Sequence, residues 1–193
     1  MTHRRTLLAA AAGALVAATT RAQQPATLDA VMAALAARRQ GRARFTETKE
    51  FPELSMPLPS SGTLSWSAPD RLEKHTTEPL EEILRVEGDR LVFARPAQNL
   101  RRELGLDDQP ELRPLVESVR ATLAGDLAVL RKHYEVRFAA QPDGGWRIEL
   151  TPRSMRVYAA LQSVAIGGRG DAVLSVVTRG NQGETRMTIT PEP

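Results

Sequence analysis

The sequence predicts an α+β protein built mainly on one antiparallel sheet, a curved, half-open β-barrel of about ten strands with an N-terminal helix and a mid-chain helical lid. Two observations support this fold class. Short runs of alternating apolar and polar residues recur roughly every 8 to 12 residues, separated by turn-forming Pro, Gly, Asn and Asp. Helical periodicity interrupts them only near the start and the middle of the chain. A large antiparallel sheet twists and curls, so helices with one apolar face cover its concave side.

Helical periodicity occurs in two places. The first helix is expected from Leu28 to about Gln40, with Thr27 as its N-cap and Gly41 as its C-terminal stop. The periodicity returns at 112–123, and Asp126 can then cap a further short helix. The apolar residues of the mid-chain helix are expected to form a lid over the sheet. These lid residues are Leu112, Leu115, Val116, Val119 and Leu123.

The strands are expected between these helices and after them. A glycine-rich segment at 167–171 has some likeness to a phosphate-binding loop, but such a loop opens a helix, whereas this one lies between two strand patterns. We therefore interpret it as a hairpin turn. The expected strands cover 45–49, 62–66, 71–76, 80–86, 90–94, 100–104, 134–138, 146–151, 161–166, 172–177 and 184–190.

The first 22 residues have the features of a secretory signal peptide. Paired arginines precede an apolar run at 7–18, and Thr20, Arg21 and Ala22 form a small-x-small cleavage site. The run is shorter than the roughly 20 residues that cross a bilayer. We expect cleavage after about Ala22 and a single mature domain at 23–193 in the periplasm. General secretion is favoured over twin-arginine export, which the paired arginines leave open.

The expected mature chain is formally neutral and contains no cysteine. The whole chain has 26 Lys and Arg against 23 Asp and Glu, and three of its arginines lie in the leader. Neutrality argues against nucleic-acid binding, which needs a concentrated positive surface. An exported domain without disulfides must be stabilised by a packed core. We expect a monomer with no membrane-spanning segment.

No arrangement of catalytic or metal-binding residues stands out, so no cofactor or metal site is predicted. The chain has no cysteine nucleophile, no G-x-S-x-G and no H-E-x-x-H motif, and only His75 and His133 lie outside the leader. Both histidines are expected at the surface, and the acidic pair at 107–108 is expected to cap a helix rather than bind a cation. The basic pairs at 38–39 and 101–102 are expected to be solvated. An enzyme is the least favoured class.

Apolar residues on successive strands can share one face of the sheet, because strand side chains alternate between the two faces. They either fill an ordinary core beneath the helices or line a cavity that is incompletely filled. Composition alone favours the filled core. The residues are Phe45, Leu64, Trp66, Leu72, Ile83, Leu91 and Phe93.

Several motifs carry a resemblance to a known family. The sequence Ser-Gly-Thr-Leu-Ser-Trp at 61–66, the Pro-Asp-Arg-Leu at 69–72 and the Val-Glu-Gly-Asp-Arg-Leu at 86–91 are similar to successive strands and turns of the LolA family of periplasmic lipoprotein carriers. The segments 68–74 and 120–127 resemble a LolA-related subgroup of periplasmic proteins. The likeness covers most of the mature chain. It is specific at 61–96 and looser elsewhere.

The resemblance implies an unclosed barrel with a helical lid. In the family, its apolar cavity receives lipoprotein acyl chains at the inner membrane and delivers them outward, which implies a donor protein at the inner membrane and an acceptor at the outer membrane. This chain departs from the pattern at Ala68, where carriers have an arginine that ties the sheet to the lid. It also has Lys74, Val92 and Ala94 where carriers have large aromatic residues. These departures imply a lid less firmly tied than in the carriers, and the resemblance therefore predicts the fold better than the cargo.

The leading interpretation is a periplasmic carrier or chaperone that binds an acyl or other lipid chain, of a lipoprotein or a lipid-like cargo, for transport toward the outer membrane. The seven strand residues would line its cavity and the five helix residues would form its lid. The alternative is a non-enzymatic periplasmic sensor or protein-docking module with a filled core. The volume of the cavity distinguishes the two, because ligand pockets measure about 300 to 1,000 Å³.

Overall fold

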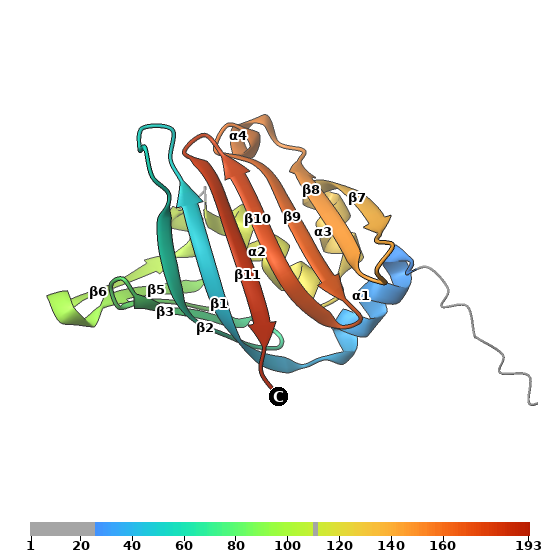
Figure 1. Cartoon of the computed structure of the whole chain (residues 1–193), viewed down its shortest axis with the longest axis horizontal. Coiled ribbons are helices and arrows are strands. Elements are labelled where there is room, and N and C mark those ends of the chain that lie inside the picture. Colours follow the sequence, from blue (N-terminus) through green and yellow to red (C-terminus); the bar gives the residue numbers. More distant parts are fainter. Residues whose placement is uncertain (1–25, 110–111) are drawn as a thin grey trace, which may run out of the picture.

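Eleven antiparallel strands form one strongly curved sheet, which has helices on its concave side (Figure 1). The structure is a computed structural model that describes residues 26–109 and 112–193, so the signal peptide predicted at 1–22 lies outside the described residues. The strands follow the order β6-β5-β4-β3-β2-β1-β11-β10-β9-β8-β7. Among the described residues no ladder joins the edge strands β6 and β7. The predicted half-open barrel is confirmed.

The sheet consists of two meanders that meet where the first strand pairs with the last. Strands β1 to β6 form one meander and β7 to β11 the other, and β1 pairs antiparallel with β11. The strands are β1 (Gln40–Glu50), β2 (Leu58–Ser67), β3 (Arg71–Glu78), β4 (Glu82–Glu87), β5 (Arg90–Arg95), β6 (Leu100–Gly105), β7 (Tyr134–Ala140), β8 (Trp146–Pro152), β9 (Leu161–Arg169), β10 (Ala172–Gly180) and β11 (Gly183–Pro191).

The helices lie at the predicted places, with two differences. Two of the predicted caps are present, since the Thr27 side chain accepts from the Ala30 amide at 3.2 Å and that of Asp126 accepts from the Val129 amide at 2.9 Å. The acidic pair at 107–108 lies instead in a 3-10 turn, where Asp108 accepts from the Gly105 amide at 3.3 Å. The first helix is shorter than predicted, and a short helix, α4, was not predicted. The helices are α1 (Leu28–Ala37), α2 (Leu112–Leu123), α3 (Leu127–His133) and α4 (Met155–Tyr158), with 3-10 turns η1 (Pro96–Gln98) and η2 (Leu106–Asp108).

The buried side chains form two separate clusters. The larger joins α1, α2 and α3 to β7, β8 and β9, and the smaller consists of Val86, Leu91 and Leu106 near the β6 edge. Gly125 lets the turn between α2 and α3 approach α1. Its φ is +65°, and a Cβ there would lie 2.2 Å from the carbonyl oxygen of Met32. The members of the larger cluster are Val31, Met32, Leu35, Ala121, Leu130, Tyr134, Trp146, Ile148, Leu150, Leu161, Val164 and Ile166.

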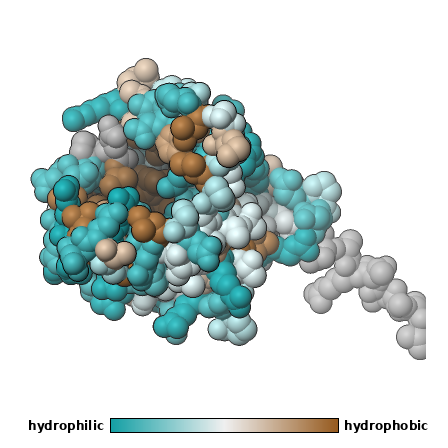
Figure 2. Space-filling model, turned by 60° about the vertical axis from the view of Figure 1, so that its left-hand side comes forward, coloured by the Kyte–Doolittle hydropathy of each residue, from teal (hydrophilic) through white to brown (hydrophobic). Residues whose placement is uncertain are grey.

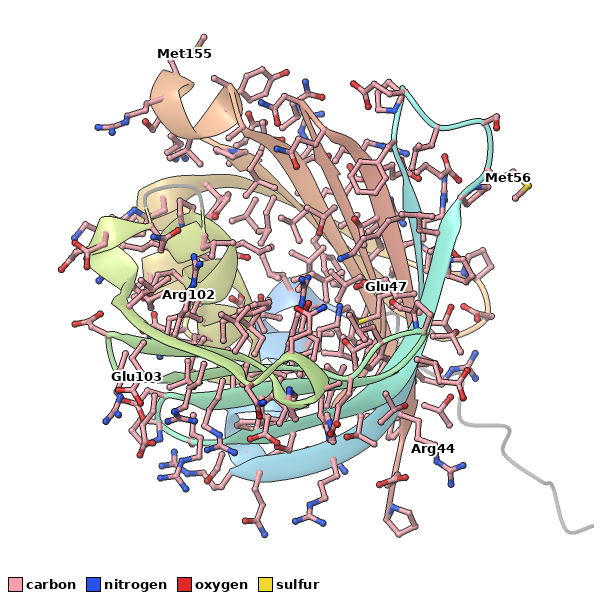
Figure 3. The ribbon with its side chains drawn as sticks, turned by 90° about the vertical axis from the view of Figure 1, so that its left-hand side faces the viewer. Arg44, Glu47, Met56, Arg102, Glu103 and Met155 are labelled. Carbon is pink, nitrogen blue, oxygen red and sulfur yellow. The ribbon has the colours of Figure 1, made fainter. Side chains whose placement is uncertain are left out.

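The convex face of the sheet carries charged side chains that pair across strands. Arg85 Nε lies 2.6 Å from a carboxylate oxygen of Glu73, and the ring of His75 lies 3.0 Å from Glu81. Figure 3 shows Arg44 directed away from the barrel. Exposed pairs of this kind add little to stability, typically ~0 to 1 kcal/mol each. The convex face is therefore a solvated surface, and the candidate site lies on the concave face.

Candidate ligand-binding cavity

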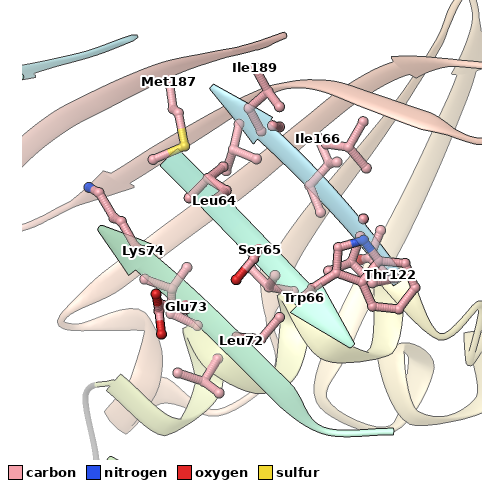
Figure 4. Close-up of a pocket in the computed structure, with 18 of the residues that line it drawn as sticks. Leu64, Ser65, Trp66, Leu72, Glu73, Lys74, Thr122, Ile166, Met187 and Ile189 are labelled. Atoms are coloured by element: carbon pink, nitrogen blue, oxygen red, sulfur yellow. The ribbon is translucent and has the colours of Figure 1, made fainter. Parts of the chain in front are cut away.

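A cavity of about 430 Å³ lies between the concave face of the sheet and α2 (Figure 4). Figure 2 shows hydrophobic side chains gathered around a hollow in the molecule. The volume falls in the range of ligand pockets and is much larger than the voids of a packed core. Most lining residues are apolar. They include Leu64, Trp66, Leu72, Leu84, Val86, Leu115, Val116, Val119, Leu123, Ile166, Val173, Val176, Met187 and Ile189.

Three of the seven strand residues predicted to line the cavity do so: Leu64, Trp66 and Leu72. Phe45 lies on the same face but is buried beside the cavity, where the ammonium of Lys74 is 4.8 Å from the centre of its ring. The alternation of β1 and β2 therefore predicted the face correctly. Burial of the large ring removes Phe45 from the lining.

Leu91 and Phe93 also lie on the concave face, toward the β6 edge of the sheet, and do not line the cavity. Leu91 packs in the smaller cluster with Leu106. The ring of Phe93 faces the guanidinium of Arg95 at 5.2 Å. Both predictions placed these residues on the correct face but in the wrong part of it.

The prediction for Ile83 is wrong, because this residue lies on the convex face. Ile83 pairs with His75, whereas its neighbour Leu84 pairs with Lys74. Directly opposed residues in an antiparallel pair share a face. Leu84 therefore lines the cavity together with Val86 of the same strand, and this spacing of two was the signal that could have identified it.

Val92 and Ala94 lie on the convex face too, opposite Arg85 and Ile83 on β4. Their lack of aromatic rings therefore does not shape the cavity. Lys74 is different, since its side chain lines the cavity. Of these three departures from the family pattern, only Lys74 changes the interior.

The helix α2 supplies four of the five predicted lid residues to the cavity: Leu115, Val116, Val119 and Leu123. Leu112 does not line it and is 36% exposed. Leu112 is the first residue of α2. The predicted lid is thus present as a helix over the cavity, with its first residue outside the apolar stripe.

Trp66 forms one wall of the cavity because Gly41 makes room for its indole ring. A Cβ on Gly41 would lie 2.7 Å from Trp66 Nε1, and the two residues are register partners on β1 and β2. The prediction that Gly41 stops the first helix is wrong. The helix α1 ends at Ala37, and Arg38 already has an extended backbone. The glycine is needed for packing against the ring and not for a helix end.

Glu47 is a buried carboxylate inside this apolar cavity, and sequence reasoning missed it. Lys74 Nζ donates to its two oxygens at 2.7 and 2.8 Å, and Ser60 Oγ donates at 3.3 Å. Figure 3 shows Glu47 directed into the barrel. Burial lowers the pKa of Lys74, and the neighbouring Glu47 carboxylate opposes this effect. The position of Glu47 two residues after Phe45 was the available signal for its inward direction.

The lid is tied to the sheet by an arginine of its own. Arg120 Nη2 donates to the carbonyl oxygen of Asp70 at 2.8 Å and to that of Gly88, and its side chain is 11% exposed. These carbonyls belong to the β2–β3 and β4–β5 turns. The lid thus has a tie that does not use Ala68, since the donor is on the lid and the acceptors are on the sheet; the expectation that it is less firmly held than in the carriers stays a prediction.

A second hydrogen bond holds the opposite side of α2. The hydroxyl of Tyr134 on β7 donates to the carbonyl oxygen of Pro114. Burial raises the pKa of Tyr134 to about 12. The lid is thus held by Tyr134 from the β7 side and by Arg120 from the β3 side.

The fold and the site together define a class of protein, an unclosed antiparallel barrel with a ligand-sized apolar cavity under a helix. The chain matches the family described as "Outer membrane lipoprotein carrier protein LolA-like" over residues 17–191, and it belongs to this family. The family is one of lipoprotein and lipid carriers. No described helix is long and apolar enough to cross a membrane.

The chain is also similar to a curated relative and to two solved structures. An outer-membrane lipoprotein carrier protein of Methylibium petroleiphilum is 29% identical over 152 residues, which are 77% of this chain and 69% of that protein. A LolA superfamily protein from Nitrosomonas europaea has a TM-score of 0.43 at 12% identity, over 86% of this chain and 92% of its own. MucB, solved in complex with MucA(peri), has a TM-score of 0.40 at 13% identity, over 86% and 54%.

Proposed function

We propose that this protein is a periplasmic carrier that shields an acyl or other lipid chain in the cavity between the sheet and α2 during transport toward the outer membrane. In this proposal the leader is cleaved after about Ala22 and the mature domain begins near Gln23. An inner-membrane donor supplies the cargo, an outer-membrane acceptor receives it, and the carrier acts as a monomer without enzymatic activity.

The cavity is the observation that carries the proposal. It has a volume of about 430 Å³ and a mainly apolar lining from both halves of the sheet and from the lid. Each buried CH₂ group of a ligand contributes about 0.8 kcal/mol, so a chain that fills this space binds without needing a polar partner. The alternative, a docking module with a filled core, leaves a cavity of this size unexplained.

The two ties of α2 suggest how cargo enters and leaves. Arg120 and Tyr134 both use their side chains to bond backbone carbonyls, and Arg113 of α2 also donates to the Asp89 carboxylate in the β4–β5 turn at 2.7 Å. Opening breaks these few hydrogen bonds, each worth about 0.5 to 3 kcal/mol net. Such a lid closes over a chain and releases it to a competing site without unfolding of the sheet.

The chain's two tryptophans allow a direct test. Trp66 lines the cavity, whereas Trp146 is buried in the larger cluster and donates to the Gly170 carbonyl at 3.0 Å. A fatty acid brominated on its chain quenches only a ring that it contacts. We expect saturable quenching in the Trp146→Phe variant, which reports Trp66, and none in the Trp66→Phe variant, which reports Trp146.

Two results would contradict the proposal. Unchanged emission of Trp66 at saturating probe, with no lipid co-purifying from the periplasm by mass spectrometry, would favour the docking module. Equal quenching of both tryptophans would indicate surface association of the probe rather than binding in the cavity.

A further inference from the structure

Two lysines and a glutamate meet inside the otherwise apolar cavity. Besides the bonds from Lys74, the carboxylate of Glu47 has Lys49 Nζ at 3.4 Å. The exposed fraction of the side chain rises from 3% for Glu47 to 22% for Lys74 and 44% for Lys49. The cluster therefore extends from the closed interior to a part of the cavity that solvent reaches.

Lysine is rare in this chain, which makes its use here informative. The sequence contains three lysines and 23 arginines, and two of the lysines line this cavity. On the convex face, by contrast, the carboxylates of Glu87 and Glu73 pair with arginines, Arg71 and Arg85. The arginine fork suits a permanent pair, whereas an ammonium is a compact point charge with three donors that can turn to a new partner.

Positive charge exceeds negative charge in this cluster. Lys74 faces Glu47 and Lys49 of β1 and Glu82 of β4, and Glu82 already pairs with Arg95 at 3.0 Å. Glu47 alone thus neutralises two ammonium groups, and one positive charge remains. Burial of these charges is costly, and apolar side chains of similar size would avoid the cost. Stability alone does not account for the cluster.

Hydroxyl groups extend the polar part of the cavity, and apolar groups form the rest. Thr185 is the register partner of Lys49, Thr178 is the partner of Thr185, and all three line the cavity. They place further donors beside the ammonium groups. Most of the remaining lining, such as Leu72 of β3 and Val116 of α2, is apolar, although Arg38, Arg42 and Ser65 also line the cavity. The cavity therefore has a positively charged, donor-rich part and an apolar part.

We propose that Lys49 and Lys74 bind the anionic group at the head of an amphiphilic cargo, a carboxylate or phosphate on an alkyl chain, while the chain lies in the apolar part. The inference rests on the carrier function proposed above and adds the class of its cargo. An anionic head completes the charge balance that Glu47 leaves open. Charge-assisted hydrogen bonds from both ammonium groups then select it over a neutral head.

Three probes with the same alkyl chain and different heads test this inference: dodecanoate, dodecanol and dodecylamine. Binding to the full mature protein is measured by calorimetry at neutral pH. We expect dodecanoate to bind about tenfold more tightly than dodecanol, and dodecylamine more weakly than either, since one charge-assisted bond is worth about one order of magnitude in affinity. Inorganic phosphate, which has the charge without the chain, is expected to bind far more weakly.

The variant Lys49→Gln should bind dodecanoate about tenfold more weakly and dodecanol unchanged, because Lys49 is half-exposed and its loss leaves the Glu47–Lys74 pair intact. Lys132→Gln is the matched control, since Lys132 is exposed on α3. It should change neither affinity. An independent readout is reductive ¹³C-methylation, which retains the lysine charges; the signals of Lys49 and Lys74 should shift with dodecanoate and not with dodecanol.

The possible failures are distinguishable. Equal affinities for dodecanoate and dodecanol would overturn the head-group inference and leave the carrier function standing. A stronger affinity for dodecylamine would also overturn it, because Glu47 would then be the recognising group. If none of the three probes binds, the carrier function fails, and this inference fails with it. Binding of inorganic phosphate as tight as that of dodecanoate would replace the amphiphile with a free anion.

Discussion

The two ends of the sheet are packed differently. Beneath β7 to β9 the interior is filled, and Ile148, Leu150 and Val164 are 0% exposed. Beneath β2 to β4 the corresponding positions, such as Leu64 and Leu72, are only partly buried and line the cavity. One sheet therefore contains a conventional core and the cavity side by side, and α2 lies over both.

This difference separates stability from function along the sheet. Close packing at the β7 end supplies most of the contacts that a domain without disulfides needs. The interior beneath β2 to β4, which we call the β3 end, can then remain incompletely filled without loss of the fold. The lid belongs to both regions, since Tyr134 holds it from the filled end and Arg120 ties it to turns of the open end.

The largest expected difference comes from truncating one side chain at each end. Ile148→Ala should lower the free energy of unfolding by about 3 kcal/mol, because it opens a new cavity in a packed cluster. Leu64→Ala should cost about 1 kcal/mol or less, because Leu64 already borders empty space. Urea unfolding of the two variants measures both values.

Affinity for an alkyl probe should show the opposite pattern. Leu64→Ala removes a wall of the cavity and should weaken binding, while Ile148→Ala should leave it nearly unchanged. Equal stability losses for the two substitutions would indicate that the β3 end is filled in solution and is packed like the β7 end.

The next effect concerns the bond from the filled end to the lid, and it depends on pH. The pKa of Tyr134 is about 12 in the folded protein against an ordinary value of 10.0. Because the folded state holds this proton more tightly, the stabilisation is complete below pH ~10 and is lost as the pH rises toward ~12. The full loss amounts to roughly 3 kcal/mol.

The variant Tyr134→Phe cannot lose this proton, so its stability should fall less steeply across the same pH range. Other groups titrate alike in both proteins, and the difference between the two curves isolates Tyr134. Parallel curves would mean that Tyr134 is accessible to solvent and that the bond to Pro114 does not hold the lid.

The sequence was sufficient to predict the sheet and the helices because both depend on local periodicity. Alternation placed Leu64, Trp66 and Leu72 correctly, and helical spacing identified α2. The same rule failed at Ile83, where two apolar residues follow each other and alternation fits either face. Only the pairing register decides between them, and register depends on the neighbouring strands.

The charged and tying residues of the site could not be predicted in the same way. Glu47 and Lys74 lie on strands separated in the sheet by β2, so their contact requires the curvature of the whole sheet. In the family pattern an arginine of the sheet, at the position of Ala68, ties the sheet to the lid. Here the donor is Arg120 of the lid, and the acceptors are carbonyls of the sheet. A sequence pattern shows which residue types are present, but it does not show which of two surfaces supplies the donor.

The smallest expected effect is local and concerns this reversed tie. Arg120→Met keeps the aliphatic length of the side chain and removes the donors to Asp70 and Gly88. The amides of 112–123 should exchange hydrogen about tenfold faster, as expected if local opening becomes easier by about 1 to 2 kcal/mol. Amides of β8 should be unaffected. Arg131→Met is the control, since Arg131 is exposed on α3. If α2 keeps its protection in Arg120→Met, the lid is held by apolar contacts, by Tyr134 and by the Arg113–Asp89 pair, and the bonds of Arg120 do not latch it.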